Sequence, residues 1–258
     1  MNIIMKKSYL IILTPIFVLL SHYLTVFPHE FCHSFMAYFL GDKANPFNLE
    51  YGGTHWTNLV FLANIDENVD YKTIFFAGQH WHVALIAFAG PGIANGLMFI
   101  ASLLLLRNKK IQAHVYWFYF LFWFNLMNLG NFYDYIPIRT FVDHGDMGHF
   151  AMGLGISPWW VYVIGSYIVG FLIWQFYTKT LITTYVTLNL SSITAKAIIM
   201  ILSTYILFKY FGGSGMHDYG DISHFLAATS ILAIPAVIAF AWPTRQWVKR
   251  AITDAKIK

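Results

Sequence analysis

The stretch SYLIILTPIFVLLSHYLTVFPHEFCHSF, residues 8–35, decides the class of fold. It opens with an apolar run close to the roughly 20 residues that a helix needs to cross a bilayer. The run then leads directly into two histidines and a glutamate. Ionisable side chains are costly at membrane depth, and those that occur there usually serve a function. The stretch therefore predicts a membrane span that carries a functional site.

The composition of the whole chain is typical of a polytopic membrane protein. Of its 258 residues, 58% are hydrophobic and only 11% are charged, whereas a soluble domain of this size needs more charge on its surface. The formal charge of +4 comes from basic residues scattered at loop ends. Because they form no basic patch, a nucleic-acid partner is excluded. The single cysteine, Cys32, excludes an internal disulfide and a cysteine-based zinc site.

Hydropathy predicts one all-α integral membrane domain over residues 1–258, with six transmembrane helices. Pro28 removes a backbone donor and should kink or restart the first helix just before His29. Residues 41–79 form the one sizeable polar segment, in which turn residues and an alternating pattern at 47–57 predict a small β-hairpin at the membrane face. The predicted helices cover about residues 8–40, 82–106, 113–136, 158–178, 186–211 and 223–243.

The distribution of charge predicts that both termini are cytoplasmic. If Lys6 and Lys7 lie inside, six crossings place most other Lys and Arg residues there too, as the positive-inside rule expects. The same topology places every histidine except His114, and every acid except Asp254, in the outer half of the molecule. Distant segments therefore bring possible metal ligands to one membrane face. The basic residues predicted in the outer half are Lys43, Lys72, Arg139 and Lys209.

Residues 29–33, HEFCH, fit the pattern H-E-x-x-H. Side chains four residues apart share a helix face, so His29 and His33 can bind one Zn²⁺ while Glu30 reaches the water that the metal activates. A catalytic zinc site usually has three protein ligands and an open position. A third ligand must therefore come from another segment, and residues 135–150, rich in Asp and His, are the best source.

Three motifs together resemble those of the site-2 protease family of intramembrane zinc metalloproteases. They are HEFCH from His29, AGPGIAN at residues 89–95 and NLGNFYDYIPIRTFVDHGDMGHF at residues 128–150, in the family's order. The resemblance covers about residues 8–155, and the additional helices at about 156–258 lie outside it. It implies that His29, His33 and Asp146 hold zinc, that Glu30 is the catalytic base, and that Asn95 orients substrate or supports the site.

The third ligand has alternatives. Asp143 lies closer than Asp146 to the family's usual offset from Pro137, and Gly145 followed by Asp146 is also typical of a helix N-terminus. The sequence DHGDMGHF at residues 143–150 recurs as DYGDISHF at residues 218–225. Either both copies start helices, or the second copy lines the same site. The alternative or supporting ligands in that region are His217, Asp218, Asp221 and His224.

Other polar and aromatic residues have simpler interpretations. His55, His80 and His82 could add a metal-binding rim, but such histidines are commonly hydrogen-bonding groups at an interface. Trp159 and Trp160 are typical of interfacial anchors.

The sequence thus predicts an intramembrane zinc metalloprotease that hydrolyses a peptide bond of a membrane protein or peptide near the outer face of the lipid bilayer. Substrate choice should come from the membrane helices or residues 41–81, since no recognition domain is evident. The alternatives are a zinc-dependent membrane lipid hydrolase, such as an amidase, and a non-enzymatic protein that binds or transports metal. The sequence does not specify an oligomeric state.

Overall fold

The structure is a computed structural model that describes residues 8–217 and 219–257. The regular structure of these residues is helical, and strand-like pairing among them is limited to one isolated antiparallel bridge between Glu50 and Asp66. Five segments are long and apolar enough to cross a membrane, which confirms an all-α, multi-pass membrane protein. These segments are Tyr9–Leu40, His80–Arg107, Pro158–Thr187, Ile193–Phe211 and Asp221–Ala241.

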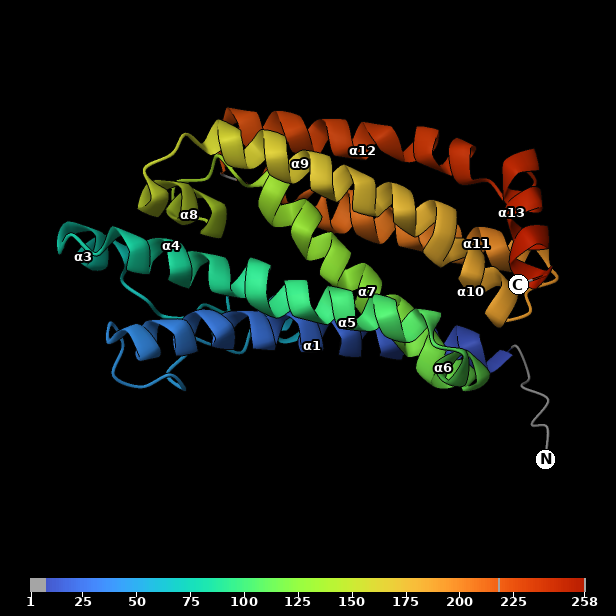
Figure 1. Ribbon diagram of the computed structural model, residues 1–258, viewed down its shortest axis with the longest axis horizontal. Helices are drawn as coiled ribbons and strands as arrows, with labels where there is room; N and C mark the ends of the chain where they lie inside the picture. The colour runs from blue at the N-terminus through green and yellow to red at the C-terminus, as the bar shows by residue number, and fades with distance from the viewer. Residues whose placement is uncertain (1–7, 218, 258) are drawn as a thin grey trace.

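The helices form two layers with one helix running obliquely between them (Figure 1). The first layer holds α1 and the continuous run of α4, the π-helical segment η1 and α5. The second holds α9, η3 and α10, then α11 and η4, and finally α12. The bounds in the first layer are α1 Ser8–Leu40, α4 His80–Phe88, η1 Ala89–Asn95 and α5 Gly96–Arg107. Those in the second are α9 Pro158–Gln175, η3 Phe176–Thr180, α10 Leu181–Thr187, α11 Ile193–Tyr205, η4 Ile206–Phe211 and α12 Asp221–Ala241.

The helix between the layers is α7, Val115–Tyr133, which corresponds to the span predicted at 113–136. It is long enough to cross, but it is not among the five apolar segments, because Asn125, Asn128 and Asn131 lie in its second half. All three asparagines are buried by the surrounding helices, and so are four aromatic residues of its first half, Phe118, Tyr119, Phe122 and Trp123. The main hydrophobic core is therefore built around α7 and not around a lipid-facing span.

Several predicted boundaries change for local reasons. The span predicted at 158–178 continues to Thr187, and the next begins only at Ile193, not at 186. Asn189 has a left-handed backbone (φ 46°), and the Ser192 hydroxyl accepts a hydrogen bond from the Ala195 amide, so the turn between the helices is specified by these two residues. Shorter helices not predicted from hydropathy are α6 Lys109–Ala113 and α13 Gln246–Ile257.

Residues 47–57 do not form the predicted hairpin. Gly52 and Gly53 both have positive φ, and the chain there folds into a loop held by Asn58, whose amide donates to the carbonyls of Tyr51 and Gly53. Two short helices follow, α2 Trp56–Phe61 and α3 Tyr71–Phe76. The alternating pattern at residues 47–57 therefore does not produce strands. Polar turn residues there favour hydrogen bonds from side chains to the backbone instead.

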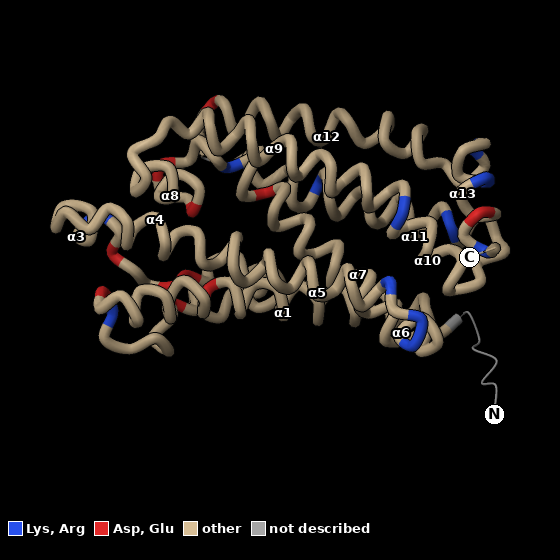
Figure 2. The backbone as a smooth tube through the Cα atoms, in the orientation of Figure 1, with Lys and Arg blue, Asp and Glu red and all other residues tan. Residues whose placement is uncertain are grey.

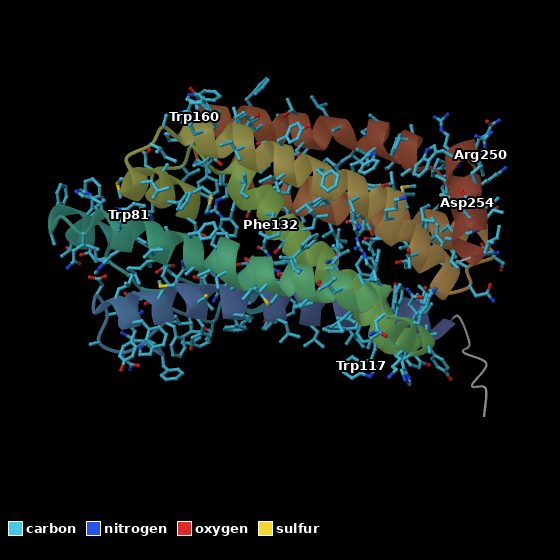
Figure 3. All side chains as sticks on the ribbon, viewed as in Figure 1. Trp81, Trp117, Phe132, Trp160, Arg250 and Asp254 are labelled. Carbon is cyan, nitrogen blue, oxygen red and sulfur yellow. The ribbon has the colours of Figure 1, made fainter. Side chains whose placement is uncertain are left out.

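Charge is separated along the long axis of the molecule. In Figure 2 most Lys and Arg residues lie near α6, α10 and α13, whereas most Asp and Glu residues lie toward α3 and the helix α8, Asp146–Leu154. Figure 3 shows the exposed Trp81 and Trp160 toward the acidic end and Trp117 toward the basic end. Indole rings favour the two water interfaces of a membrane, so the long axis lies across the bilayer.

Candidate metal centre

The structure brings His29, His33 and Asp146 together, as predicted. The Nε2 atoms of the two histidines are 3.0 Å apart, and Oδ2 of Asp146 lies 3.1 Å from Nε2 of His29 and 3.4 Å from Nε2 of His33. Among the described residues, these three form one group that could hold a metal ion. Both histidines are buried, and the Asp146 side chain is only 15% exposed.

Helix α1 presents the two histidines because it continues through Pro28 and does not restart there. Residues 29 and 33 are four apart and therefore lie on one face of the helix. That face meets η1, where Gly90 has no side chain to intervene. A Cβ atom at Gly90 would lie 2.1 Å from Nε2 of His33 and 2.7 Å from Nε2 of His29. Gly90 in the AGPGIAN motif is therefore required for the imidazoles to pack against this helix.

Hydrogen bonds determine which nitrogen of each imidazole carries the proton. Nδ1 of His33 lies 2.5 Å from the carbonyl oxygen of Ile86, which can only accept, so Nδ1 is the donor. Nδ1 of His29 lies 2.6 Å from Oδ1 of Asn95. The amide nitrogen of Asn95 donates to the Thr25 carbonyl at 3.2 Å, which fixes the orientation of the amide and leaves Oδ1 to accept from His29.

The Asn95 amide is itself held by α7. Its nitrogen also donates to Oδ1 of Asn128 at 3.1 Å, and the nitrogen of Asn128 donates to the Phe124 carbonyl at 2.8 Å. This ladder runs from a main-chain oxygen of α7 to the His29 ring. Asn95 therefore orients the ring of His29, a candidate ligand. Metal-bound histidines are commonly held in this way by a partner on their other ring nitrogen.

With a proton on each Nδ1, the two Nε2 atoms are the ring nitrogens left to bind a metal ion or a further proton. They converge on each other and on a carboxylate oxygen, an arrangement that a shared cation stabilises. Ligand atoms about 2.0–2.1 Å from a tetrahedral zinc ion lie about 3.3–3.4 Å apart, close to the 3.0–3.4 Å observed here. The donor set of two imidazoles and one carboxylate therefore fits Zn²⁺.

Asp146 reaches the histidines from the start of α8. Burial by itself would raise the pKa of its carboxyl group, but the adjacent His33 and His29 outweigh burial and hold this pKa well below its usual range. Asp146 is therefore ionised, as a metal-ligating carboxylate must be.

Glu30 lies beside the candidate ligands, on the wall of a cavity of about 860 Å³ that Asp146 also lines. The side chain is buried, and Glu67 from the loop before α3 is close enough to interact with it. Lys43 positions that loop, because its ammonium group donates to the carbonyls of Asn48, Glu67 and Asn68. Glu30 is therefore in contact with the cavity, although most of its side chain is buried.

The other predicted candidates lie elsewhere. Asp143 and Asp221 are exposed and outside the group of three, and Asp218 lies outside the described residues. His217 lines the cavity without joining the group, and His224 is exposed. The proposed histidine rim does not form: His55 is exposed, His80 packs against Phe75, and His82 pairs with Asp42 at 2.8 Å.

Four residues near the centre were not predicted from the sequence. Tyr135 stacks on the His29 ring with centroids 4.8 Å apart, and Asn128 completes the ladder described above. Glu67 faces Glu30, and Tyr71 stacks on His149 at 4.1 Å. Burial, with smaller contributions from Glu67 and Asp146, raises the pKa of the Tyr71 phenol well above its ordinary value. Asn128 and Tyr135 lie within the motif at residues 128–150, but the sequence gives neither a role, and no motif marks Glu67 or Tyr71. Each is placed by packing between segments distant in sequence.

Comparison with known proteins adds no relative. No family model matches the chain, and neither curated proteins nor solved structures provide a match. The resemblance to site-2 proteases therefore stays a prediction, based on its three motifs.

Proposed function

We propose that this protein is a membrane-embedded zinc metallopeptidase of the site-2 protease type. The observation that carries the proposal is the convergence of two imidazole Nε2 atoms and a carboxylate oxygen within 3.0–3.4 Å, beside a glutamate on a cavity wall. This combination is typical of hydrolytic zinc sites. The ligands are His29, His33 and Asp146, and Zn²⁺ bound to them would supply the Lewis acidity that lets water attack an acyl carbonyl near neutral pH.

The residues of the chain have the other roles in the proposed reaction. Glu30 accepts the proton of the attacking water and later gives it to the leaving amine. Asn95 and the Ile86 carbonyl hold the two imidazoles in the tautomer that binds metal. The surrounding buried residues restrict bulk water, while the cavity admits substrate. A helical substrate must unwind locally, because its carbonyls are otherwise occupied by backbone hydrogen bonds.

The charge separation in Figure 2 supports an orientation. The basic end, near α6, α10 and α13, would face the cytoplasm by the positive-inside rule. The acidic end would then face outward and contain the metal centre. Both chain termini would be cytoplasmic, and the substrate would be a membrane protein or membrane-bound peptide cleaved toward the outer face.

The test combines metal analysis with a matched pair of glutamate variants. Purified protein should contain one zinc ion per chain. Glu30→Gln should retain zinc and lose about 10²–10⁴-fold in cleavage rate, the usual contribution of a general base. Glu50→Gln, which alters an exposed glutamate, should retain both zinc and activity.

Product analysis with peptide and lipid substrates separates the proposed reaction from amide hydrolysis of a lipid. Cleavage of lipid alone would reassign the substrate class. Metal flux into vesicles that persists in Glu30→Gln would show a transporter instead. Wild-type protein without bound zinc would contradict the assignment of the site.

A further inference from the structure

Arg139 is a partly buried cation on the wall of the cavity that contains the metal centre. It lies just after the π-helical segment η2, Asp134–Ile138, which extends α7, and before α8. Glu30 and Asp146 line the same cavity. The Arg139 side chain is 20% exposed, so it faces the cavity and not the bulk solvent.

The hydrogen bonds of the Arg139 guanidinium are incomplete. Its Nη1 is 3.5 Å from Oδ2 of Asp134, at the limit for a hydrogen bond, and its Nε is buried without a partner. The other oxygen of Asp134 already accepts from the Ser214 hydroxyl. The Nε is not open to the cavity, so a ligand there would bind the Nη atoms. A mostly buried guanidinium with incomplete pairing is costly unless a ligand supplies acceptors.

Aromatic rings hold the guanidinium in place beside the metal centre. Its central carbon lies 4.6 Å from the centroid of the Tyr219 ring and 5.3 Å from that of Tyr135. Tyr135 in turn stacks on His29. Cation–π contacts engage the faces of a guanidinium and leave its edge donors free, which is the geometry that binds a planar carboxylate.

The charges on the cavity wall limit how much negative charge a ligand can carry. Asp134 and Asp146 both act on Arg139. Glu30 and Glu67 add further carboxylates to the same wall. A ligand with a single negative charge is therefore repelled less than a phosphate monoester, which carries close to two.

We infer that Arg139 recognises a carboxylate of the substrate close to the bond that is cleaved. The carboxylate belongs either to an Asp or Glu side chain or to a free C-terminus, and both present the same planar anion. The inference rests on the proposed peptidase function and gives that site a substrate class: peptides with an acidic group near the scissile bond. Asp134 and the two tyrosines are positioning residues for the guanidinium.

The test measures binding without cleavage. One fluorescent apolar peptide is prepared in versions with Glu or Gln at a single position and with a free or amidated C-terminus. Each is titrated against the full-length Glu30→Gln protein in detergent, with zinc content measured in parallel. Removal of the recognised carboxylate should weaken binding about 10- to 100-fold, the value of a charge-assisted hydrogen bond. Whichever of the two changes has this effect identifies the source of the carboxylate.

Variants of residues on the cavity wall then test whether Arg139 causes the preference for acidic peptides. Arg139→Gln, made together with Asp134→Asn to avoid an unpaired buried acid, should bind acidic and neutral peptides equally. Arg139→Lys should retain part of the preference. Lys209→Gln removes an exposed charge from the same cavity and should change the preference by less than about 3-fold, as expected for a screened, solvated charge.

Three outcomes would overturn the inference. They are equal binding of all peptide versions by the Glu30→Gln protein, an unchanged preference in the Arg139 variants, and loss of the preference in Lys209→Gln. Inorganic phosphate that displaces the peptide more strongly than acetate would also overturn it and indicate a phosphorylated ligand. A protein that lacks zinc yet discriminates between the peptides would contradict the proposed function while supporting this inference.

Discussion

The sequences DHGDMGHF at residues 143–150 and DYGDISHF at residues 218–225 begin two helices with different roles. In each copy an Asp is the first helical residue after a Gly, at Asp146 of α8 and at Asp221 of α12. An acidic side chain suits the positive end of the helix dipole in both places. Only Asp146 meets the two histidines, whereas Asp221 is exposed. A local motif specifies a helix start, and the packing of that helix decides whether the Asp lies beside the two histidines.

One position in the motif distinguishes the two copies. A Cβ atom at Gly148 would lie 2.1 Å from the carbonyl oxygen of Val142, so the first turn of α8 folds back closely on the preceding segment. The second copy has Ser223 at the matching position, where a side chain is accommodated and buried. Helix α8 then packs along α4 in the first layer, next to the histidines.

The largest effect is expected when the first Asp of each helix is replaced. Asp146→Ala should lower zinc affinity by more than about 100-fold, because it removes a ligand and not merely a supporting residue. Asp221→Ala should leave zinc content at the wild-type level. Metal analysis after dialysis against a graded series of chelator concentrations measures both variants. Equal losses in the two variants would show that the second copy also lines the site.

Exchange of the residue that distinguishes the two copies should have the next largest effect. Gly148→Ser places a side chain against the main chain at Val142, which cannot move as easily as a side chain can. We expect destabilisation of about 1–3 kcal/mol, as for other overpacked sites, with loss of zinc. Ser223→Gly is the matched control and should retain zinc. Thermal unfolding in detergent, with zinc analysis, provides the measurement. A Gly148→Ser protein with full zinc content would show that the close turn does not position Asp146.

A smaller effect is expected from the residue that orients His29. Asn95→Leu removes the acceptor of the His29 Nδ1–H bond and should weaken zinc binding about 10- to 100-fold. Asn131→Leu is a control on α7, since the amide of Asn131 donates to its own helix at Met127. Zinc titration against a fluorescent chelator measures both. Equal zinc affinity in the wild type and Asn95→Leu would show that the hydrogen bonds from Asn128 through Asn95 to His29 do not contribute to metal binding.

The smallest effect concerns the histidine that each copy contains. Burial lowers the pKa of His149, although Asp146 and Glu67 act in the opposite direction. The unfolded chain therefore binds this proton more readily, and stability should fall as the pH decreases below the ordinary histidine pKa of about 6.5. His149→Gln should reduce that dependence relative to wild type, and His224→Gln, which alters an exposed residue, should not. Melting temperatures measured between pH 5 and about 8 test the difference, and parallel curves for all three proteins would contradict it.

Sequence reasoning predicts those features that depend on local pattern. The long apolar runs identify the crossing segments, and the four-residue spacing of His29 and His33 predicts their shared face, because both follow from helix geometry. The choice of Asp146 over Asp143 follows from the family resemblance. The structure places Asp146, and not Asp143, beside the two histidines, and its role as a metal ligand stays a prediction.

Features that depend on contacts between distant segments were missed. The β-type pattern at 47–57 is overridden by hydrogen bonds from Asn58, and Glu67 reaches Glu30 only because Lys43 holds the loop. Tyr135 and Arg139 are near the centre because η2 extends α7 toward it. None of these contacts leaves a periodic signal in the sequence.

The polarity of α7 explains why the helices after residue 156, which contain none of the three proposed ligands, belong to the same unit. The ladder from the Phe124 carbonyl to His29 requires amide side chains at mid-helix, and exposed to hydrocarbon these amides would lack the solvent they need. α9 and η4 of the second layer pack against α7, and Gly130 of α7 lies directly against the Phe211 ring of η4. Removal of these helices would expose that face of α7 to lipid and shift the backbone that holds Asn128, and would thereby disturb proton placement on His29.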